Sequence, residues 1–235
     1  DQTEADGEGE KGVPPVEGAL ERYREADMTE NPASPPEWTA TELESLAAHD
    51  GADTKELPGL PCDAMLAGSL EAGFGTLCHA LLEHKLGTDA GGFRIPTSLR
   101  MELDDRQLES VIREADGLVS RFLTSPAREL LDGALTVETE VPFLLRYERD
   151  NRHAFISGVI DLLLERTNEF IIIDFKTNRI LRRGEYHTQA EVYREAVSEW
   201  TDKPVSCYIA YLRNSSLVAI PPGPLPDFFA ITGRA

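Results

Sequence analysis

Two aspartates and a lysine close two neighbouring strand-like segments of this sequence. Asp161 ends one apolar run, and Asp174 stands two residues before Lys176 at the end of the next. Because side chains alternate along a strand, Asp174 and Lys176 share one face while Phe175 points to the other. Two carboxylates from adjacent strands, with a main-chain carbonyl, suit a hard cation such as Mg²⁺ or Mn²⁺. Such a cation activates water and offsets charge on a phosphate, so the spacing indicates phosphodiester hydrolysis.

These residues also allow a plainer structural interpretation. Aspartate is common in turns, so Asp161 can simply close a strand. Asp174 and Lys176 can likewise form an ordinary ion pair at a strand end. The spacing alone favours neither interpretation, and the surrounding elements and motifs must decide between them.

Segments rich in β-branched and apolar residues surround the two aspartates and predict a sheet. A polar turn over 148–152 separates the first two segments, which indicates a hairpin, and residues 170–175 have the continuous apolar character of a buried central strand. We expect three successive antiparallel strands followed, after a helix, by two more. The predicted strands cover residues 136–145, 154–164, 170–175, 205–212 and 217–220.

Apolar residues at helical spacing predict helices before and after the three strands. Thr39, with a glutamate three residues later, resembles a capping box that opens a first helix. Gly73 and Gly75 interrupt the pattern of the next helix, so we expect it to begin near Gly75. Longer patterns predict helices over 104–123 and 186–200. The order of elements favours an α/β fold, with a mixed central sheet flanked by helices and an N-terminal helical region.

The 235 residues suffice for one sizeable domain and a tail. Residues 1–37 contain glycine, proline and 11 acidic residues, so we expect an acidic, partly disordered connector there and one domain over 38–235. No apolar run approaches the roughly 18 residues that a membrane helix needs. The cysteines Cys62, Cys78 and Cys207 show no Cys-x-x-Cys spacing, which excludes a four-cysteine zinc site and suits free thiols in a reducing cytoplasm.

Acidic residues are concentrated toward the N-terminus. The formal net charge is −19, of which residues 1–60 contribute −12, residues 61–145 contribute −7 and residues 146–235 contribute 0. The last third holds both aspartates, and a bound divalent cation would make its local surface positive. The overall acidity therefore does not exclude nucleic acid as a substrate, although it predicts weak binding of DNA by these residues alone.

The order of several short motifs resembles that of the PD-(D/E)XK nuclease superfamily. Its Gly-x-x-Asp, Asp-x-Lys and Gln-x-x-x-Tyr motifs are matched in order and spacing by Gly158-Val-Ile-Asp161, Asp174-Phe-Lys176 and Gln189-Ala-Glu-Val-Tyr193. Within that superfamily the chain is most similar to the C-terminal nuclease domain of RecB/AddA-like helicase-nucleases of the UvrD family. Three further motifs of that branch are resembled by Thr39-Ala-Thr-Glu-Leu43, Gly75-Thr-Leu-Cys-His79 and Glu140-Val-Pro-Phe143.

The resemblance implies a metal site and a catalytic lysine. A divalent cation would be held by His79, Asp161, Asp174 and the main-chain carbonyl of Phe175. Lys176 would be the catalytic lysine, acting beside that cation. Mg²⁺ is the implied metal, with Mn²⁺ able to substitute for it.

The resemblance also suggests residues around that site. Gln189 and Tyr193, one helical turn apart, would position the lysine or contact DNA. Glu140 is a further candidate metal ligand, for which Glu138 on the same strand face competes. The basic residues that follow the lysine are either DNA contacts or a solvated loop: Arg179, Arg182 and Arg183.

The resemblance implies a deoxyribonuclease of the exonuclease type that processes double-strand breaks for recombinational repair. Its partners would be DNA, a UvrD-like helicase motor N-terminal in the same parent chain, and a second subunit of an AddB/RecC-like kind. The location would be the bacterial cytoplasm, in association with the nucleoid. The alternative is a catalytically inactive nuclease-like module with a structural or DNA-end-binding role.

Two motifs missing from the sequence, and its first residue, refine that expectation. No lysine follows a glycine, so the Walker loop of an ATPase does not occur in this sequence. Only Cys207 follows Tyr193, so the iron–sulfur cluster of some relatives is not expected. The sequence starts at Asp1 rather than at a methionine, as expected of a fragment of a longer protein.

Overall fold

A six-stranded mixed sheet lies at the centre of the described residues. The structure is a computed structural model that describes residues 35–47, 54–87, 93–182 and 184–233. The strands of the central sheet are β1 (Glu37–Thr39), β3 (Thr136–Arg149), β4 (Arg152–Glu165), β5 (Phe170–Lys176), β7 (Val205–Tyr211) and β8 (Ser216–Ile220). A separate antiparallel pair is formed by β2 (Thr54–Glu56) and β6 (Ile180–Arg182).

Strand β4 has partners along both edges. β3 pairs antiparallel with it along nearly its whole length, as a long hairpin that turns through Asp150 and Asn151. On the opposite edge, β1 runs parallel to Phe155–Ser157 and β5 runs antiparallel to Leu162–Glu165. β7 pairs parallel with β5, and β8 pairs antiparallel with β7. The predicted succession of three antiparallel strands is confirmed as β3, β4 and β5.

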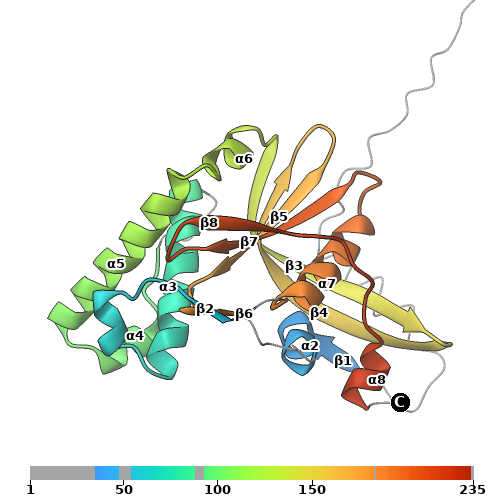
Figure 1. Cartoon of the computed structure of the whole chain (residues 1–235), viewed down its shortest axis with the longest axis horizontal. Helices are drawn as coiled ribbons and strands as arrows, with labels where there is room; N and C mark the ends of the chain where they lie inside the picture. Colours follow the sequence, from blue (N-terminus) through green and yellow to red (C-terminus); the bar gives the residue numbers. More distant parts are fainter. Residues whose placement is uncertain (1–34, 48–53, 88–92, 183, 234–235) are drawn as a thin grey trace, which may run out of the picture.

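Helices cover both faces of the sheet (Figure 1). One apolar core contains residues of α2 (Ala40–Leu46), α7 (His187–Ser198) and α8 (Phe228–Thr232). The other contains residues of the 3₁₀ helix η1 (Pro61–Ala64), α3 (Ser69–Leu86), α4 (Thr97–Glu102), α5 (Asp105–Leu123) and α6 (Arg128–Asp132). This is the mixed α/β fold with flanking helices that the sequence predicts.

Strand β5 is buried on both faces and separates the two cores. Ile172 packs in the core of α2 and α7, whereas Ile171 and Ile173 pack in the core of α3 and α5. A strand covered by helices on both sides must be apolar at every position, which explains the unbroken run of isoleucines. Asp174 and Lys176 then interrupt the apolar pattern on the α7 side, and the candidate site begins there.

The helix predicted to begin near Gly75 begins earlier, at Ser69. α3 runs through Gly73 and Gly75, so these glycines do not start it. A Cβ at Gly73 would lie 2.6 Å from Ser98 Oγ and 3.2 Å from the side chain of Leu99, both in α4. The close approach of α4 offsets the low helix propensity of glycine, and the sequence pattern does not reveal that packing.

Side-chain caps fix the starts of two predicted helices. Asp104 accepts hydrogen bonds from the N–H groups of Arg106 and Gln107, and the Gln107 side chain accepts one from Asp104 N–H, which completes a capping box before α5. Thr39 Oγ1 accepts a hydrogen bond of 3.1 Å from Glu42 N–H at the start of α2. Both starts follow the sequence prediction.

Part of the predicted domain organisation concerns residues outside the described ranges. Residues 1–34 are among them, so the acidic connector over 1–37 and the domain over 38–235 remain predictions. The cysteines Cys62, Cys78 and Cys207 are all buried and free. Among the described residues, no helix combines the length and the apolar character needed to cross a membrane.

Gly158 is packed so closely that a side chain there should destabilise the fold. An alanine Cβ would lie 2.6 Å from Phe143 Cε1 and 3.4 Å from Ala40 Cβ. Because Phe143 is buried, we expect Gly158→Ala to lower the free energy of unfolding by about 1–3 kcal/mol. The matched control is Gly117→Ala in α5, where a Cβ meets only Arg121 Nη1 at 3.5 Å, and which should stabilise by up to about 1 kcal/mol. Urea unfolding measures both changes, and equal midpoints would contradict the packing argument.

Candidate functional site

The candidate site lies where β5 separates from β4. Their pairing ends at Leu162 and Ile173, while β5 continues beside β7 as far as Lys176. Beyond this point the Asp161 side chain replaces the main chain of β4 as the hydrogen-bond partner of β5: its Oδ2 accepts a hydrogen bond of 2.7 Å from Phe175 N–H. This bond holds the Asp161 carboxylate in the fork between the two strands.

Glu140 lies opposite Asp161 in an unusual backbone conformation. The β3–β4 register runs on both sides of Glu140, which places it across from Asp161. Its φ is +50°, in the left-handed region that costs a non-glycine residue about 1–3 kcal/mol. Such strain persists where the surrounding structure imposes it, and it is concentrated at functional sites.

His79 reaches the fork from α3. Its Nδ1 lies 3.5 Å from Asp161 Oδ1 and 3.6 Å from Glu140 Oε1, and its Nε2 lies 3.3 Å from the Phe175 carbonyl oxygen. When that carbonyl accepts a hydrogen bond from Nε2–H, the Nδ1 lone pair faces the two carboxylates. The imidazole is then oriented as a ligand toward the centre of the fork.

Two features let α3 approach the fork closely. A Cβ at Gly75 would lie 3.3 Å from Thr177 Oγ1, so glycine brings the helix against the end of β5. The ring of Phe175 packs edge to face against the rings of His79 and Phe122, with centroids 6.1 and 5.2 Å apart. The glycine and the phenylalanine together set the depth at which His79 enters the site.

The fork gathers more negative charge than the fold itself offsets. Burial disfavours the His79 imidazolium, yet the charges of Asp161, Glu140 and Asp174 outweigh it and raise the pKa of His79 to about 9. Burial, reinforced by the Asp174 charge, raises the pKa of Asp161 to about 7, against the opposing effects of His79 and Lys176. Both shifts mean that the metal-free site favours additional positive charge.

These residues fit a divalent cation. Ligand atoms of His79, Glu140 and Asp161 all lie within 4.8 Å of one another. The carboxylates suit Mg²⁺ or Mn²⁺, and the imidazole favours the transition metal of the two. The three side chains are 27%, 44% and 12% exposed, respectively, so the group opens to solvent on the Glu140 side. A phosphate can approach from that side.

Lys176 lies on the α7 side of the fork. Its Nζ is 2.6 Å from Asp174 Oδ2, 3.3 Å from Gln189 Oε1 and 4.6 Å from the centre of the Tyr186 ring. Gln189 Nε2 donates a hydrogen bond of 2.7 Å to the Tyr193 hydroxyl. Burial opposes the charged form of Lys176, but the two aspartates outweigh it and raise its pKa, so the ammonium is retained at neutral pH.

Comparison with known proteins gives this geometry a family. The model of the PD-(D/E)XK nuclease superfamily matches residues 55–221, which include every residue of the fork. The chain belongs to the PD-(D/E)XK nuclease superfamily. The family and the fold expected from the sequence motifs are thereby confirmed.

Several curated proteins similar to this PD-(D/E)XK chain are subunits of an "ATP-dependent helicase/nuclease". The chain is 27% identical over 159 residues to the one from Anoxybacillus flavithermus, covering 61% of this chain and 13% of that protein. Proteins of the same name match from Bacillus licheniformis (27% over 186 residues, 68% and 15% covered) and Staphylococcus epidermidis (24% over 169 residues, 61% and 14% covered). The chain therefore spans about one seventh of the length of these relatives.

The PD-(D/E)XK fold brings most of the predicted site residues together. His79, Asp161 and Glu140 form one group. The two competing glutamates are both exposed, but Glu140 contacts His79 and Glu138 lies outside the group. Asp174 lies beside the lysine, outside that group, although its charge acts on His79 and Asp161. Their roles as ligands and catalysts remain predictions.

The basic residues after β5 are mostly engaged elsewhere or not described. The Arg179 guanidinium forms an ion pair with Glu56 in β2, and the Arg179 carbonyl accepts a hydrogen bond of 2.7 Å from Leu57 N–H. Arg179 therefore joins the β5–β6 connection to the β2 segment. The Arg182 side chain and Arg183 lie outside the described residues, so their predicted contact with DNA stays a prediction.

Two buried charged residues near the site carry no signal in the sequence. Arg213 is 6% exposed, makes two hydrogen bonds to the Asp63 carboxylate at 2.8 and 2.9 Å, and donates to the Thr177 carbonyl at 2.6 Å. It thereby fastens the residue after Lys176 to η1. Glu44 is also 6% exposed and contacts the first turn of α7. Glu44 directly follows the motif segment Thr39-Ala-Thr-Glu-Leu43 and is not part of it.

Proposed function

We propose that this chain is a metal-dependent DNA nuclease that hydrolyses phosphodiester bonds with Mg²⁺, for which Mn²⁺ can substitute. The observation that carries the proposal is the group of His79, Glu140 and Asp161 at the fork, next to the half-buried ammonium of Lys176. Placing several carboxylates close together in a partly buried site destabilises a fold unless a cation offsets their charge. An ordinary strand-end ion pair would not require the histidine and the second strand to converge on that point.

In this proposal the fork holds the cation. His79 Nδ1, Asp161 and Glu140 supply ligands, and Asp174 is a further carboxylate for the set. The Phe175 carbonyl would join it only if the His79 ring turned, because here this oxygen accepts from Nε2–H, on the opposite edge of the ring from Nδ1. When bound, the cation would lower the pKa of a water and offset charge on the phosphate. The hydrogen bond from Phe175 N–H engages Asp161 Oδ2, so Oδ1, which faces His79 Nδ1 at 3.5 Å, is the oxygen that would bind the cation.

Lys176 acts from the α7 side. Its ammonium is placed to donate a hydrogen bond to the attacking water or to a phosphate oxygen, where charge develops in the transition state. Because Gln189 Nε2 donates to the Tyr193 hydroxyl, the Gln189 carbonyl oxygen faces Lys176 and accepts from it. Gln189 and Tyr193 thus fix the direction of the ammonium and leave part of its donor capacity for substrate.

The names of the relatives support a place for this domain in a helicase-nuclease. We propose exonucleolytic cleavage of strands delivered by a UvrD-like motor N-terminal in the same parent chain, with a second subunit of an AddB/RecC-like kind. The role would be end processing of double-strand breaks in recombinational repair, in the bacterial cytoplasm near the nucleoid. No iron–sulfur cluster belongs to the proposal, since only Cys207 follows Tyr193.

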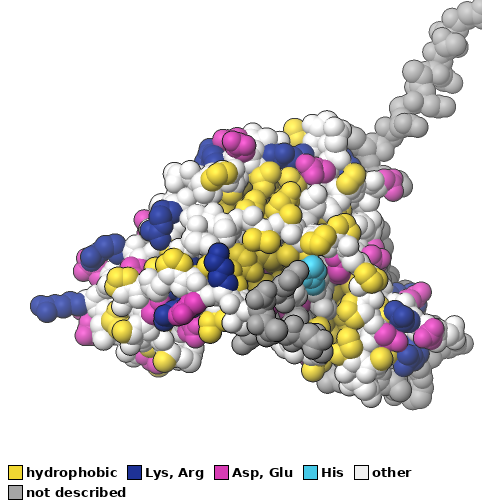
Figure 2. All heavy atoms as spheres, viewed as in Figure 1, with side chains coloured by type: hydrophobic (Ala, Val, Ile, Leu, Met, Phe, Trp, Pro, Cys, Tyr) yellow, Lys and Arg dark blue, Asp and Glu magenta, His cyan; other side chains and the backbone are white. Residues whose placement is uncertain are grey.

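Weak DNA binding by the chain alone is part of the same proposal. On the face drawn in Figure 2, lysine and arginine side chains are scattered among acidic ones and form no continuous band. The net charge of −19 adds a general repulsion of phosphate. The motor and the second subunit would therefore supply most of the affinity for DNA.

The experiment that tests the proposal is a cleavage assay on end-labelled DNA. We expect Mg²⁺ and Mn²⁺ at millimolar concentration to support cleavage of a linear strand, and EDTA to abolish it. A closed circular single strand of the same sequence should survive if cleavage is exonucleolytic. A folded chain that binds Mn²⁺ but cuts neither substrate would instead favour the inactive nuclease-like module.

A further inference from the structure

We propose that Glu44 is a positioning residue for Lys176, acting through the first turn of α7. The proposal rests on the nuclease function argued above and extends it to a residue outside the metal group. Glu44 belongs to α2, more than a hundred residues before α7 in the sequence. It contacts Tyr186, the residue before α7, and Gln189 in its first turn, and both of their side chains lie against the Lys176 ammonium.

The Glu44 carboxylate caps α7 from another element. Its Oε1 accepts a hydrogen bond of 2.6 Å from Tyr186 N–H, and its Oε2 accepts one of 2.9 Å from Gln189 N–H. The first N–H groups of a helix have no partner within the helix, and a buried carboxylate satisfies them with favourable charge. α7 has no side-chain cap of its own, because the residue before it, Tyr186, has a φ of +74° and makes no such bond.

The same two residues support the lysine. The Gln189 side chain accepts a hydrogen bond of 3.3 Å from Lys176 Nζ, and the Tyr186 ring lies 4.6 Å from that nitrogen. Glu44 therefore holds the main chain of both residues whose side chains surround the ammonium. A shift of the first turn of α7 would move both side chains at once.

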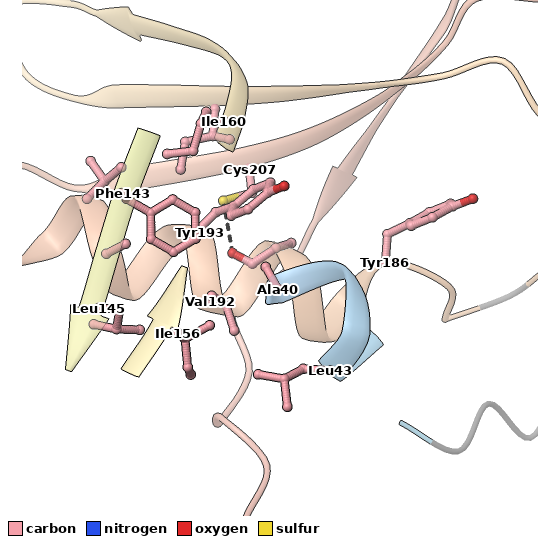
Figure 3. Close-up of a cluster of buried hydrophobic side chains, with 14 of the residues drawn as sticks. Ala40, Leu43, Phe143, Leu145, Ile156, Ile160, Tyr186, Val192, Tyr193 and Cys207 are labelled. Carbon is pink, nitrogen blue, oxygen red and sulfur yellow. Dashed lines mark hydrogen bonds between the residues drawn. The ribbon is translucent and has the colours of Figure 1, made fainter. Parts of the chain in front are cut away.

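Glu44 is itself fixed by rigid elements. β1 pairs parallel with β4, and Thr39, the last residue of β1, caps α2. Ala40 and Leu43 of α2 are buried in the same cluster as Val192 of α7, and Figure 3 shows α2 lying beside α7 with these side chains labelled. The carboxylate is thus carried by a helix that packs directly against the helix it caps.

The decisive variant is Glu44→Gln, which keeps the shape but supplies only one acceptor oxygen. Its amide N–H₂ would face one of the two N–H groups, so the turn must shift. Small displacements of positioning groups cost large factors in rate, and we expect kcat for DNA cleavage to fall about 10-fold to 100-fold with KM nearly unchanged. The matched controls are Leu43→Ala, which removes core packing of the same helix, and Glu42→Gln, which removes the same charge.

A double variant with Gln189 distinguishes a positioning role of Glu44 from a general loss of stability. If Glu44 acts through Gln189 and Tyr186, adding Glu44→Gln to Gln189→Ala should lower kcat by a smaller factor than Glu44→Gln does in the wild type, because only the Tyr186 contact is left to lose. Leu43→Ala should lower the melting temperature more than Glu44→Gln does, yet keep kcat at a temperature where it is folded. Multiplying effects in the double variant, or an equal loss of kcat in Leu43→Ala, would overturn the proposal.

A measurement without activity distinguishes this inference from the proposed function. Amide hydrogen exchange of Tyr186 and Gln189 should accelerate at least about 10-fold in Glu44→Gln, with exchange in β5 unchanged. Unchanged exchange at both amides would contradict the role of Glu44 even if the chain cleaves DNA. A wild-type chain that cleaves nothing would count against the nuclease function, while accelerated exchange would still support the hold of Glu44 on α7.

Discussion

Replacing Lys176 with alanine should reduce the rate of DNA cleavage about 10²-fold to 10³-fold while leaving the affinity for Mn²⁺ nearly unchanged. The half-buried ammonium contacts Asp174 and Gln189 and is not itself a metal ligand, so its loss removes no ligand from the site. Lys176→Arg should fail as well, because a planar guanidinium cannot replace a compact ammonium between Asp174 and Gln189. Single-turnover cleavage and Mn²⁺ titration measure the two quantities.

The Lys176 variants must be shown to be folded, because removing the lysine also affects the stability of the fold. The Asp174 side chain is 4% exposed and faces the ammonium at 2.6 Å, so removing Lys176 leaves a buried charge unpaired and can cost about 3–5 kcal/mol. Lys176→Met keeps a long apolar side chain in place of the lysine, so less packing is lost than in Lys176→Ala. Cleavage is measured well below the melting temperature of each variant. A folded Lys176→Ala or Lys176→Met variant with wild-type cleavage would exclude the proposed role.

Replacing Asp161 with asparagine should weaken Mn²⁺ binding by at least about 10-fold, since even residues that only support metal ligands cost 10-fold to 100-fold. Asparagine keeps an oxygen that can accept the hydrogen bond from Phe175 N–H, so the fork should remain in place. The variant also relieves charge repulsion at the fork, so the metal-free fold should be at least as stable as that of the wild type. Isothermal titration with Mn²⁺ and a thermal melt in EDTA measure both effects.

Two glutamates on the same strand provide the internal control for the metal group. Glu140→Gln removes a carboxylate 3.6 Å from His79 Nδ1, whereas Glu138→Gln removes an equal charge from an exposed position. We expect the first to weaken Mn²⁺ binding several-fold and the second to leave it within about 2-fold, as for a screened surface charge. Equal effects of the two variants would mean that net charge, rather than ligation, governs binding.

Local patterns predict the elements that carry the site. The unbroken apolar run before Asp174 identifies a strand covered on both faces, and the polar turn after residue 147 identifies the β3–β4 hairpin. Asp174 and Lys176 fall on one face because alternation is a property of any strand. The cap that Thr39 forms at the start of α2 is equally local, since its hydrogen bond joins residues three positions apart.

Contacts between distant segments cannot be predicted in the same way. The start of α3 differs from the prediction because Gly73 is tolerated through packing against α4, which no helical pattern records. Glu44 and Arg213 are buried by elements far from them in the sequence, so each resembles an ordinary charged residue. The preference for Glu140 over Glu138 likewise depends on where α3 places His79, and so on tertiary structure.

The most direct test of the metal site is anomalous scattering from crystals of the chain grown with Mn²⁺. We expect one manganese peak in the fork, bonded to His79 Nδ1 and to carboxylate oxygens of Asp161 and Glu140 at about 2.0–2.3 Å. The same map shows whether Asp174 and the Phe175 carbonyl join the ligand set. An ordered fork with no manganese at millimolar concentration, or manganese bound without His79 and Asp161, would contradict the proposed metal-dependent nuclease site.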